Sequence, residues 1–174
     1  MTTDAPVPDR PFDAVTTVRS HTSMAGYSGT PLPKKLGIVD GTRVALISAP
    51  QGFETTLGGL PPGVSVCEQA RGNLDVIVFF ATRRRELERR FPVFARALVP
   101  DGGLWVGWPK RTSGVATDLT GDVAREIGLA AGLVDNKVCA IDDIWSGLRF
   151  VFRLADRPAR VRAPRARAPR VDRG

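Results

Sequence analysis

The feature that most constrains this fold is a nearly uninterrupted apolar run, LDVIVFFA, at residues 74–81. A strand with one face in solvent alternates apolar and polar residues, whereas this run is apolar at every position after Asp75. Continuous apolar strands of this kind are buried on both faces, inside a parallel sheet that carries helices on either side. The run therefore predicts an α/β protein with a central parallel strand.

The patterns before this run predict two shorter strands and a helix. Residues 41–49 and 64–68 are expected to be strands, because each is a short apolar or alternating run bounded by turn residues. Between them, residues 53–57 are expected to form a short helix that ends at Gly58 and Gly59. The first two strands and their helix thus precede the central strand.

The patterns after the run predict a helix, a turn and another strand. Apolar residues between 82 and 98 recur at spacings of three and four, with Thr82 as the expected N-cap. Pro92 is expected to kink or split this helix near Arg90. A turn over 99–103 and a strand over 104–108 should follow.

The C-terminal part of the chain predicts one more helix and a hairpin. Asp118 or Thr120 should cap a helix that runs to about Ala131. Residues 134–141 and 147–154 should pair as an antiparallel hairpin. The complete order of elements predicts a three-layer α/β sandwich with a mostly parallel, Rossmann-like sheet.

Composition excludes several classes of function. The chain has 174 residues, which fits one domain, and its single histidine, His21, lies in a polar leader. Cys67 and Cys139 are far apart and are expected to be buried apolar residues, so neither a disulfide framework nor a metal site is expected. No apolar stretch is long enough to span a membrane and no signal-peptide pattern opens the chain, which predicts a cytoplasmic protein.

The formal charge of +7 comes mainly from the C-terminal tail. Residues 157–174 hold seven arginines against one aspartate, a charge of +6 that leaves +1 for residues 1–156. With three prolines and no aromatic residue, this tail is expected to be disordered. It is either a solvated end or a contact for nucleic-acid phosphates. The arginines that would make that contact are Arg157, Arg160, Arg162, Arg165, Arg167, Arg170 and Arg173.

The N-terminal residues 1–23 lack apolar periodicity and are expected to be a disordered leader. The α/β domain is expected to span residues 24–156, and Met24 is an alternative start to Met1. At the beginning of this domain, Tyr27–Leu36 contains two prolines and is expected to lie extended across the surface.

The run from Asp75 to Trp108, with its PDGG turn, resembles the second half of class I S-adenosylmethionine-dependent methyltransferases. The helix and hairpin from Asp118 to Leu154 resemble the ending of that fold, where the last strand inserts antiparallel. The resemblance implies a methyltransferase-like sheet and S-adenosylmethionine as a cofactor.

Three further motifs resemble a small bacterial family of unknown function over about residues 26–155. These motifs are YSGTPLPKKLGI (27–38), WPKRTSGVATDL (108–119) and DDIWSGLRF (142–150). This second resemblance implies no established activity.

The chain departs from the methyltransferase pattern at two places. The loop SAPQG at residues 48–52 has one glycine and a proline without an N–H, where a cofactor loop is rich in glycine. Only residues 69–73 separate the second strand from Leu74, although a parallel crossover normally needs a dozen or more. The helix–strand–helix segment expected there is missing, so the second strand is either short and splayed or antiparallel at an edge.

Ligands of open α/β sheets bind beyond the carboxyl ends of the strands. The loop from Trp108 to Gly114 offers a ring, two cations and two hydroxyls close before a helix N-terminus, a set that suits an anionic group. Glu68 lies where an acidic residue would bind ribose hydroxyls, or is a solvated strand end. The candidate ligand residues are Trp108, Lys110, Arg111, Ser113, Gly114, Gln51, Gly52 and Glu68.

Substituting Lys110 or Trp108 is expected to weaken ligand binding more than substituting Glu68. The alternative is that the loop is only structural, with Trp108 capping the core. Asp142, Asp143 and Trp145 fall in the hairpin turn, where Asp is favoured for turn geometry alone.

Three hypotheses for the function follow. The first is a non-catalytic or regulatory module that binds a small anionic or nucleotide-like ligand. The second is a minimal S-adenosylmethionine-dependent methyltransferase, since methyl transfer depends mostly on positioning. The third is a nucleic-acid-associated protein that acts through its arginine tail.

Overall fold

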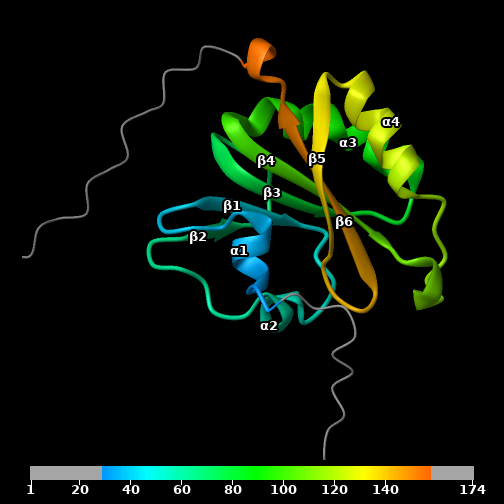
Figure 1. Cartoon of the computed structure of the whole chain (residues 1–174), viewed down its shortest axis with the longest axis horizontal. Helices are drawn as coiled ribbons and strands as arrows, with labels where there is room; N and C mark the ends of the chain where they lie inside the picture. The colour runs from blue at the N-terminus through cyan, green and yellow to red at the C-terminus, as the bar shows by residue number, and fades with distance from the viewer. Residues whose placement is uncertain (1–28, 158–174) are drawn as a thin grey trace, which may run out of the picture.

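The computed structural model describes residues 29–157, so the leader at 1–23, Tyr27 and the tail beyond Arg157 lie outside the described residues. Its centre is one six-stranded sheet (Figure 1). In spatial order the strands are β2 (Ser65–Cys67), β1 (Arg43–Ile47), β3 (Leu74–Phe80), β4 (Leu98–Pro109), β6 (Trp145–Phe152) and β5 (Leu133–Ala140). Only β6 runs opposite to the others, between β4 and β5.

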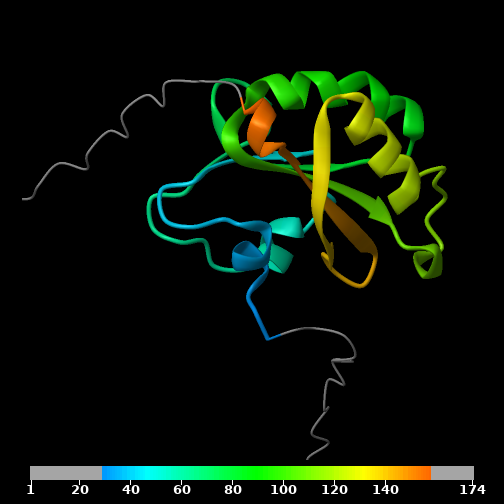
Figure 2. The same ribbon diagram turned by 45° about the horizontal axis from the view of Figure 1, so that its top comes forward.

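Helices cover both faces of this sheet (Figures 1 and 2). One face carries α3 (Arg84–Ala97) and α4 (Gly121–Ala130), and the other carries the short α1 (Leu32–Leu36) and α2 (Phe53–Leu57). The expected three-layer sandwich with a mostly parallel sheet and a closing antiparallel hairpin is confirmed. No helix among the described residues is long and apolar enough to cross a membrane.

The central strand β3 contributes side chains to the apolar clusters on both faces of the sheet, as its sequence predicted. Ile77 and Phe79 point into the cluster under α3 and α4, whereas Val78 and Phe80 point into the cluster under α1 and α2. All four side chains are fully or almost fully buried. This strand therefore anchors the sheet from both sides.

The segment before β1 is helical, so the expectation of an extended Tyr27–Leu36 is wrong for its described part. Pro33 falls in the first two positions of α1, where a missing N–H leaves no helical hydrogen bond unmade. The indole Nε1 of Trp105 donates to the Leu36 carbonyl at 2.9 Å, in a buried contact that joins α1 to β4.

The start of α3 also differs from the expectation. Its N-cap position is Arg83 rather than Thr82, and no side chain within this helix end caps it. Instead, Asp118 Oδ1 accepts a hydrogen bond from the Arg84 amide at 2.6 Å. The helix runs unbroken through Pro92, so the expected split is wrong; the proline lies on the exposed side, opposite buried residues such as Phe91 and Phe94.

Strand β4 begins directly after α3, so the chain does not form the separate turn expected over 99–103. Residues 99–102 instead make an irregular, bulged part of the strand, since Leu98 pairs with Leu74 and Gly103 with Val76. Gly102 and Gly103 serve close packing inside the strand rather than a turn. A Cβ on Gly102 would lie 2.8 Å from the Asp75 carbonyl, and one on Gly103 would collide with the Arg149 guanidinium. Arg149 Nε is buried without a hydrogen-bond partner among the described residues, and burial lowers the pKa of this guanidinium.

At the sheet edge, β2 is short and pairs parallel to β1, so the antiparallel alternative is wrong. The connection to β3 contains no helix, as its length predicted. Because β2 has only three residues, the chain has a short way back to the start of β3. Ser65 and Cys67 pair with Arg43 and Ala45, and this row of side chains at the edge is exposed apart from Ala45.

The two cysteines are not buried as expected. Cys67 is exposed on the edge strand, and Cys139 is partly buried on β5. The reason is their position: β2 and β5 are the two outer strands of the sheet, where one side lacks a neighbour. Burial nevertheless raises the pKa of the Cys139 thiol.

Candidate functional site

The parallel strands bring several loops to one edge of the sheet, which we call the rim. It holds the loop after β1, the end of β2, residues 81–83 after β3 and residues 110–118 after β4. In open α/β sheets this is the edge where ligands bind. The sequence candidates lie on or near this rim, because Trp108 is at the end of β4 and the others follow strands.

One pocket on the rim, which we call the β1–β2 pocket, has a volume of about 520 Å³, within the usual range for small-molecule sites. It lies where the loop after β1, the first turn of α2, the end of β2 and α3 meet. Its lining residues are Leu46, Ile47, Ser48, Ala49, Pro50, Gly52, Phe53, Glu54, Thr55, Val66, Glu68 and Arg90.

The loop after β1 has an unusual backbone where it borders this pocket. Ser48 has a φ of 54°, the only positive φ at a non-glycine among the described residues, and such conformations concentrate at functional sites. Gly52 follows with a φ of 78° at the N-cap of α2. The Phe53 amide donates to the Pro50 carbonyl at 3.1 Å, so the loop closes as a turn despite having one glycine.

Arg90 reaches this loop from α3 and is the only cation among the residues that line the β1–β2 pocket. Its guanidinium lies 5.0 Å from the Phe79 ring centroid and 5.3 Å from that of Phe94, distances typical of cation–π contacts. Its Nη1 donates to Ser48 Oγ at 3.4 Å. Sequence reasoning missed this residue because, on the helix alone, it is one arginine among several.

Two carboxylates line the same pocket. Glu68 follows the last residue of β2, where the sequence placed a candidate ligand residue, and Glu54 lies in the first turn of α2. Both side chains are exposed. Glu54 was not among the sequence candidates, and only its position after the β1 loop could have suggested it.

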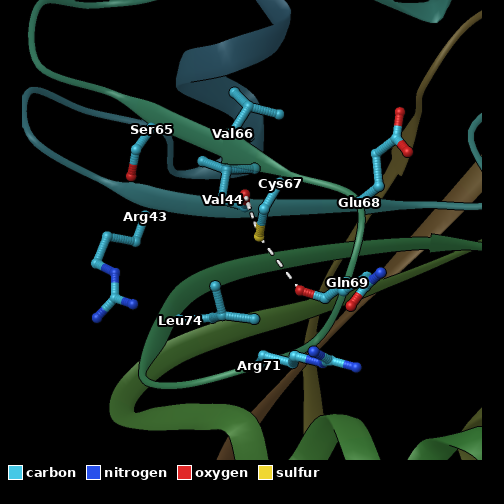
Figure 3. A pocket seen from close by; sticks show the side chains of 9 residues that line it. All are labelled: Arg43, Val44, Ser65, Val66, Cys67, Glu68, Gln69, Arg71 and Leu74. Carbon is cyan, nitrogen blue, oxygen red and sulfur yellow. Dashed lines mark hydrogen bonds between the residues drawn. The ribbon is translucent and has the colours of Figure 1, made fainter.

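A second hollow of about 510 Å³ lies on the other side of the β2 end (Figure 3). It shares Val66 and Glu68 with the β1–β2 pocket, but its remaining lining comes from β2, the first residues of β1 and β3, and the loop between β2 and β3. The Cys67 thiol donates to the Gln69 carbonyl at 3.2 Å, and Figure 3 shows the Glu68 carboxylate pointing away from that thiol. Glu68 is therefore turned away from the floor of this second hollow.

The sequence candidates divide into two groups in space. Gly52 and Glu68 line the β1–β2 pocket, and Gln51 is exposed beside Gly52 without lining it. The candidates of the loop after β4 do not line that pocket; they are Trp108, Lys110, Arg111, Ser113 and Gly114.

The loop after β4 is held by its own contacts. Lys110 Nζ donates to the Asp142 carbonyl at 2.6 Å, and its amide donates to Ile144 at 2.7 Å, so Lys110 fastens the β5–β6 turn. Ser113 Oγ donates to the Lys110 carbonyl at 2.7 Å. Trp108 packs on the apolar cluster under α3 and α4. Gly114, with a φ of 73°, ends the short 3-10 helix Arg111–Ser113.

Among the described residues, no three His, Cys, Asp or Glu side chains are grouped so that they could hold a metal ion. The side chains that line the β1–β2 pocket supply hydroxyls, two carboxylates and one guanidinium.

Comparison with known proteins identifies the fold. No protein-family profile and no curated protein sequence matches the chain. Among solved structures, a SAM-dependent methyltransferase from Aquifex aeolicus matches with a TM-score of 0.50 and 14% identity, over 67% of this chain and 85% of that protein. A precorrin-6y C5,15-methyltransferase from Geobacter metallireducens matches with a TM-score of 0.51 and 11% identity, over 70% and 86%.

A third match, described as a possible exported protein from Bordetella parapertussis, has a TM-score of 0.51 and 12% identity over 70% of this chain and 66% of that one. Identities this low establish the fold alone. The chain has a methyltransferase-like Rossmann core, with β2 at one edge of its sheet and β5 at the other.

Proposed function

We propose that this protein binds S-adenosylmethionine in the β1–β2 pocket. The observation that carries the proposal is that one pocket joins the strained loop after β1 to the acidic residue after β2. The resemblance to methyltransferases implies that the cofactor lies at these two places, the loop after the first strand and the acidic residue after the second. The pocket volume is also suitable for a ligand of that size.

The charge of the pocket favours this ligand over an anionic one. Its lining contains two carboxylates and one guanidinium, so its ionisable side chains sum to a net negative charge. A nucleotide phosphate would face like charges, which disfavour binding. S-adenosylmethionine carries a sulfonium and an ammonium against one carboxylate, so its net positive charge complements this set.

The residues present fit the parts of the ligand. The Glu68 carboxylate can accept hydrogen bonds from ribose hydroxyls, and the apolar side chains of Leu46 and Val66 offer a surface for the adenine ring. Ser48 and Gly52, which both have a positive φ, line the pocket beside them. When bound, the ligand supplies a methyl group made electrophilic by its sulfonium.

The hydrogen bonds made by side chains of the neighbouring rim favour a binding or regulatory role over catalysis. Lys110 and Ser113 are engaged in loop hydrogen bonds, and Asp118 caps α3. These side chains therefore hold the rim together instead of facing an acceptor. Methyl transfer is the second candidate function, supported by the fold shared with two methyltransferases and by the small demand that such a reaction makes on acid–base groups.

The proposal is tested with the full chain by calorimetric titration and thermal unfolding with S-adenosylmethionine, S-adenosylhomocysteine and adenosine nucleotides. At about a hundred times its dissociation constant, a ligand should stabilise the protein by about 2.7 kcal/mol, a shift of several degrees. Glu68→Gln should weaken binding about tenfold, while Glu88→Gln, an exposed change outside the pocket, should not.

Lys110→Gln separates the two places proposed for the ligand. Retained affinity supports the β1–β2 pocket, whereas a loss larger than that of Glu68→Gln moves the ligand to the loop after β4. Formation of S-adenosylhomocysteine that depends on Glu68 and on an added acceptor would establish the second candidate function. Absence of any binding would refute the proposal.

A further inference from the structure

We infer that Arg90 selects ligands that carry an α-carboxylate, by pairing its guanidinium with that group at the α3 side of the β1–β2 pocket. This inference deepens the proposed function and rests on it. It concerns a residue far in sequence from the loop after β1 and from β2, which no pattern in the sequence marked as part of a site.

The guanidinium of Arg90 is held in place before any ligand arrives. The rings of Phe79 and Phe94 both lie within cation–π distance of it, and both rings are fully or almost fully buried in the core. Such contacts restrict the rotamers of a long side chain, so less entropy is lost when it binds a partner. The side chain still has 34% of its surface exposed, which leaves it accessible from the pocket.

The groups that already contact Arg90 leave room for a carboxylate. Ser48 Oγ is a neutral partner at 3.4 Å, and the Glu86 carboxylate is 3.6 Å away on the preceding turn of the same helix. A long, partly exposed ion pair of this kind contributes little. A guanidinium carries five donors in a planar fork, so donors remain for a bidentate contact with a ligand carboxylate.

The charges of the residues that line the pocket determine which end of the ligand lies near Arg90. The other ionisable groups that line the pocket are Glu54 and Glu68, which repel a carboxylate and attract an ammonium. Arg90 is the only positively charged residue in that lining, and its guanidinium attracts a carboxylate. The ligand is therefore oriented with its ribose toward Glu68 and its carboxylate toward Arg90.

Decarboxylated S-adenosylmethionine gives a direct test, because it differs from S-adenosylmethionine only in the missing carboxylate. The wild-type full chain should bind the complete ligand about tenfold or more tightly, since a charged hydrogen bond is lost with the carboxylate. Arg90→Gln should lose this preference for the complete ligand, because only the two carboxylates of the pocket remain to act on its charge. Arg90→Lys should restore part of the preference because it keeps the charge.

Arg89→Gln is the matched control, since it removes the same charge from the neighbouring position of α3 without touching the pocket. Its ligand preference should equal that of the wild type. Circular dichroism of each variant confirms that the helix is retained. Double-mutant coupling between the residue change and the ligand change measures the contact itself and would not arise from a purely structural role.

The outcomes separate this inference from the proposed function. If both ligands bind the wild type equally, or if Arg90→Gln keeps the preference, the role of Arg90 is refuted and the proposed function stands. If neither ligand binds the wild type, both are refuted. A preference that Arg90→Gln abolishes and Arg89→Gln preserves establishes the role of Arg90.

Discussion

Gly128 illustrates how a single position sets the distance between a helix and the sheet. It lies on the buried side of α4, and a Cβ built on it would collide with the ring of Phe150 in β6. That ring is fully buried and packs edge-on against Phe91 at a centroid distance of 5.2 Å. The missing side chain therefore allows α4 to approach the sheet closely enough to cover this aromatic pair.

Gly128→Ala should destabilise the protein although alanine is the better helix former. Overpacking a core position typically costs about 1–3 kcal/mol, which exceeds the gain of about 1 kcal/mol in helix propensity. Gly121→Ala is the control, because its Cβ would meet Trp108 only at 3.4 Å and more. Urea unfolding compares the two, and equal stability of both variants would contradict the packing role of Gly128.

At the scale of elements, α3 depends on a residue from a distant loop. The Asp118 carboxylate caps the Arg84 amide, while the Thr117 hydroxyl and the Asp118 amide donate to the Thr82 carbonyl. The same loop leads to α4, whose own cap is the Thr120 hydroxyl, which accepts from the Val123 amide at 3.2 Å. The two helices that cover one face of the sheet are thus fastened at adjacent ends.

Asp118→Ala and Thr82→Ala separate the observed cap from the one that the sequence predicted. Asp118→Ala should lower the free energy of unfolding by about 0.5–2 kcal/mol, the usual effect of removing an N-cap. Thr82→Ala should have a smaller effect, because only its backbone carbonyl takes part in these contacts. Chemical unfolding measures both, and the reverse order would mean that Thr82 caps α3 after all.

Across the whole molecule, most of the net positive charge and the proposed ligand pocket lie in different parts of the chain. The first 156 residues carry a net charge of +1, whereas the segment from Arg157 onward carries +6. The pocket proposed for S-adenosylmethionine lies among the described residues and its lining is net negative. We propose that nucleic-acid contact belongs to the arginine segment and is independent of the pocket.

Deletion of residues 157–174 should therefore abolish salt-dependent binding to a nucleic acid and leave the affinity for S-adenosylmethionine within about twofold. Phosphate contacts release counterions, so the affinity of the intact chain should fall steeply as salt is raised. Fluorescence anisotropy with a labelled duplex at two salt concentrations measures the first effect, and calorimetry the second. Nucleic-acid affinity that survives the deletion would place the contact elsewhere.

The sequence by itself determined the architecture. The apolar run of β3 predicted a strand buried on both sides, the C-terminal runs predicted the β5–β6 hairpin, and the short connection before Leu74 predicted a missing segment. Each of these follows from local properties, namely the period of apolar residues and the length of chain between them. The position of Glu68 after a strand was predicted in the same way, whereas its role as a ligand residue stays a prediction.

Only the tertiary structure decided which side chains meet. Asp118 caps a helix that begins 34 residues earlier, Lys110 fastens a turn 32 residues later, and Arg90 reaches the loop after β1 across 42 residues. Gly102 and Gly103, whose sequence suggests a turn, lie in β4, where a carbonyl and a guanidinium from neighbouring strands leave no room for a side chain. A local pattern records whether a residue is buried, but not which partner it meets, because that partner is set by how distant segments pack.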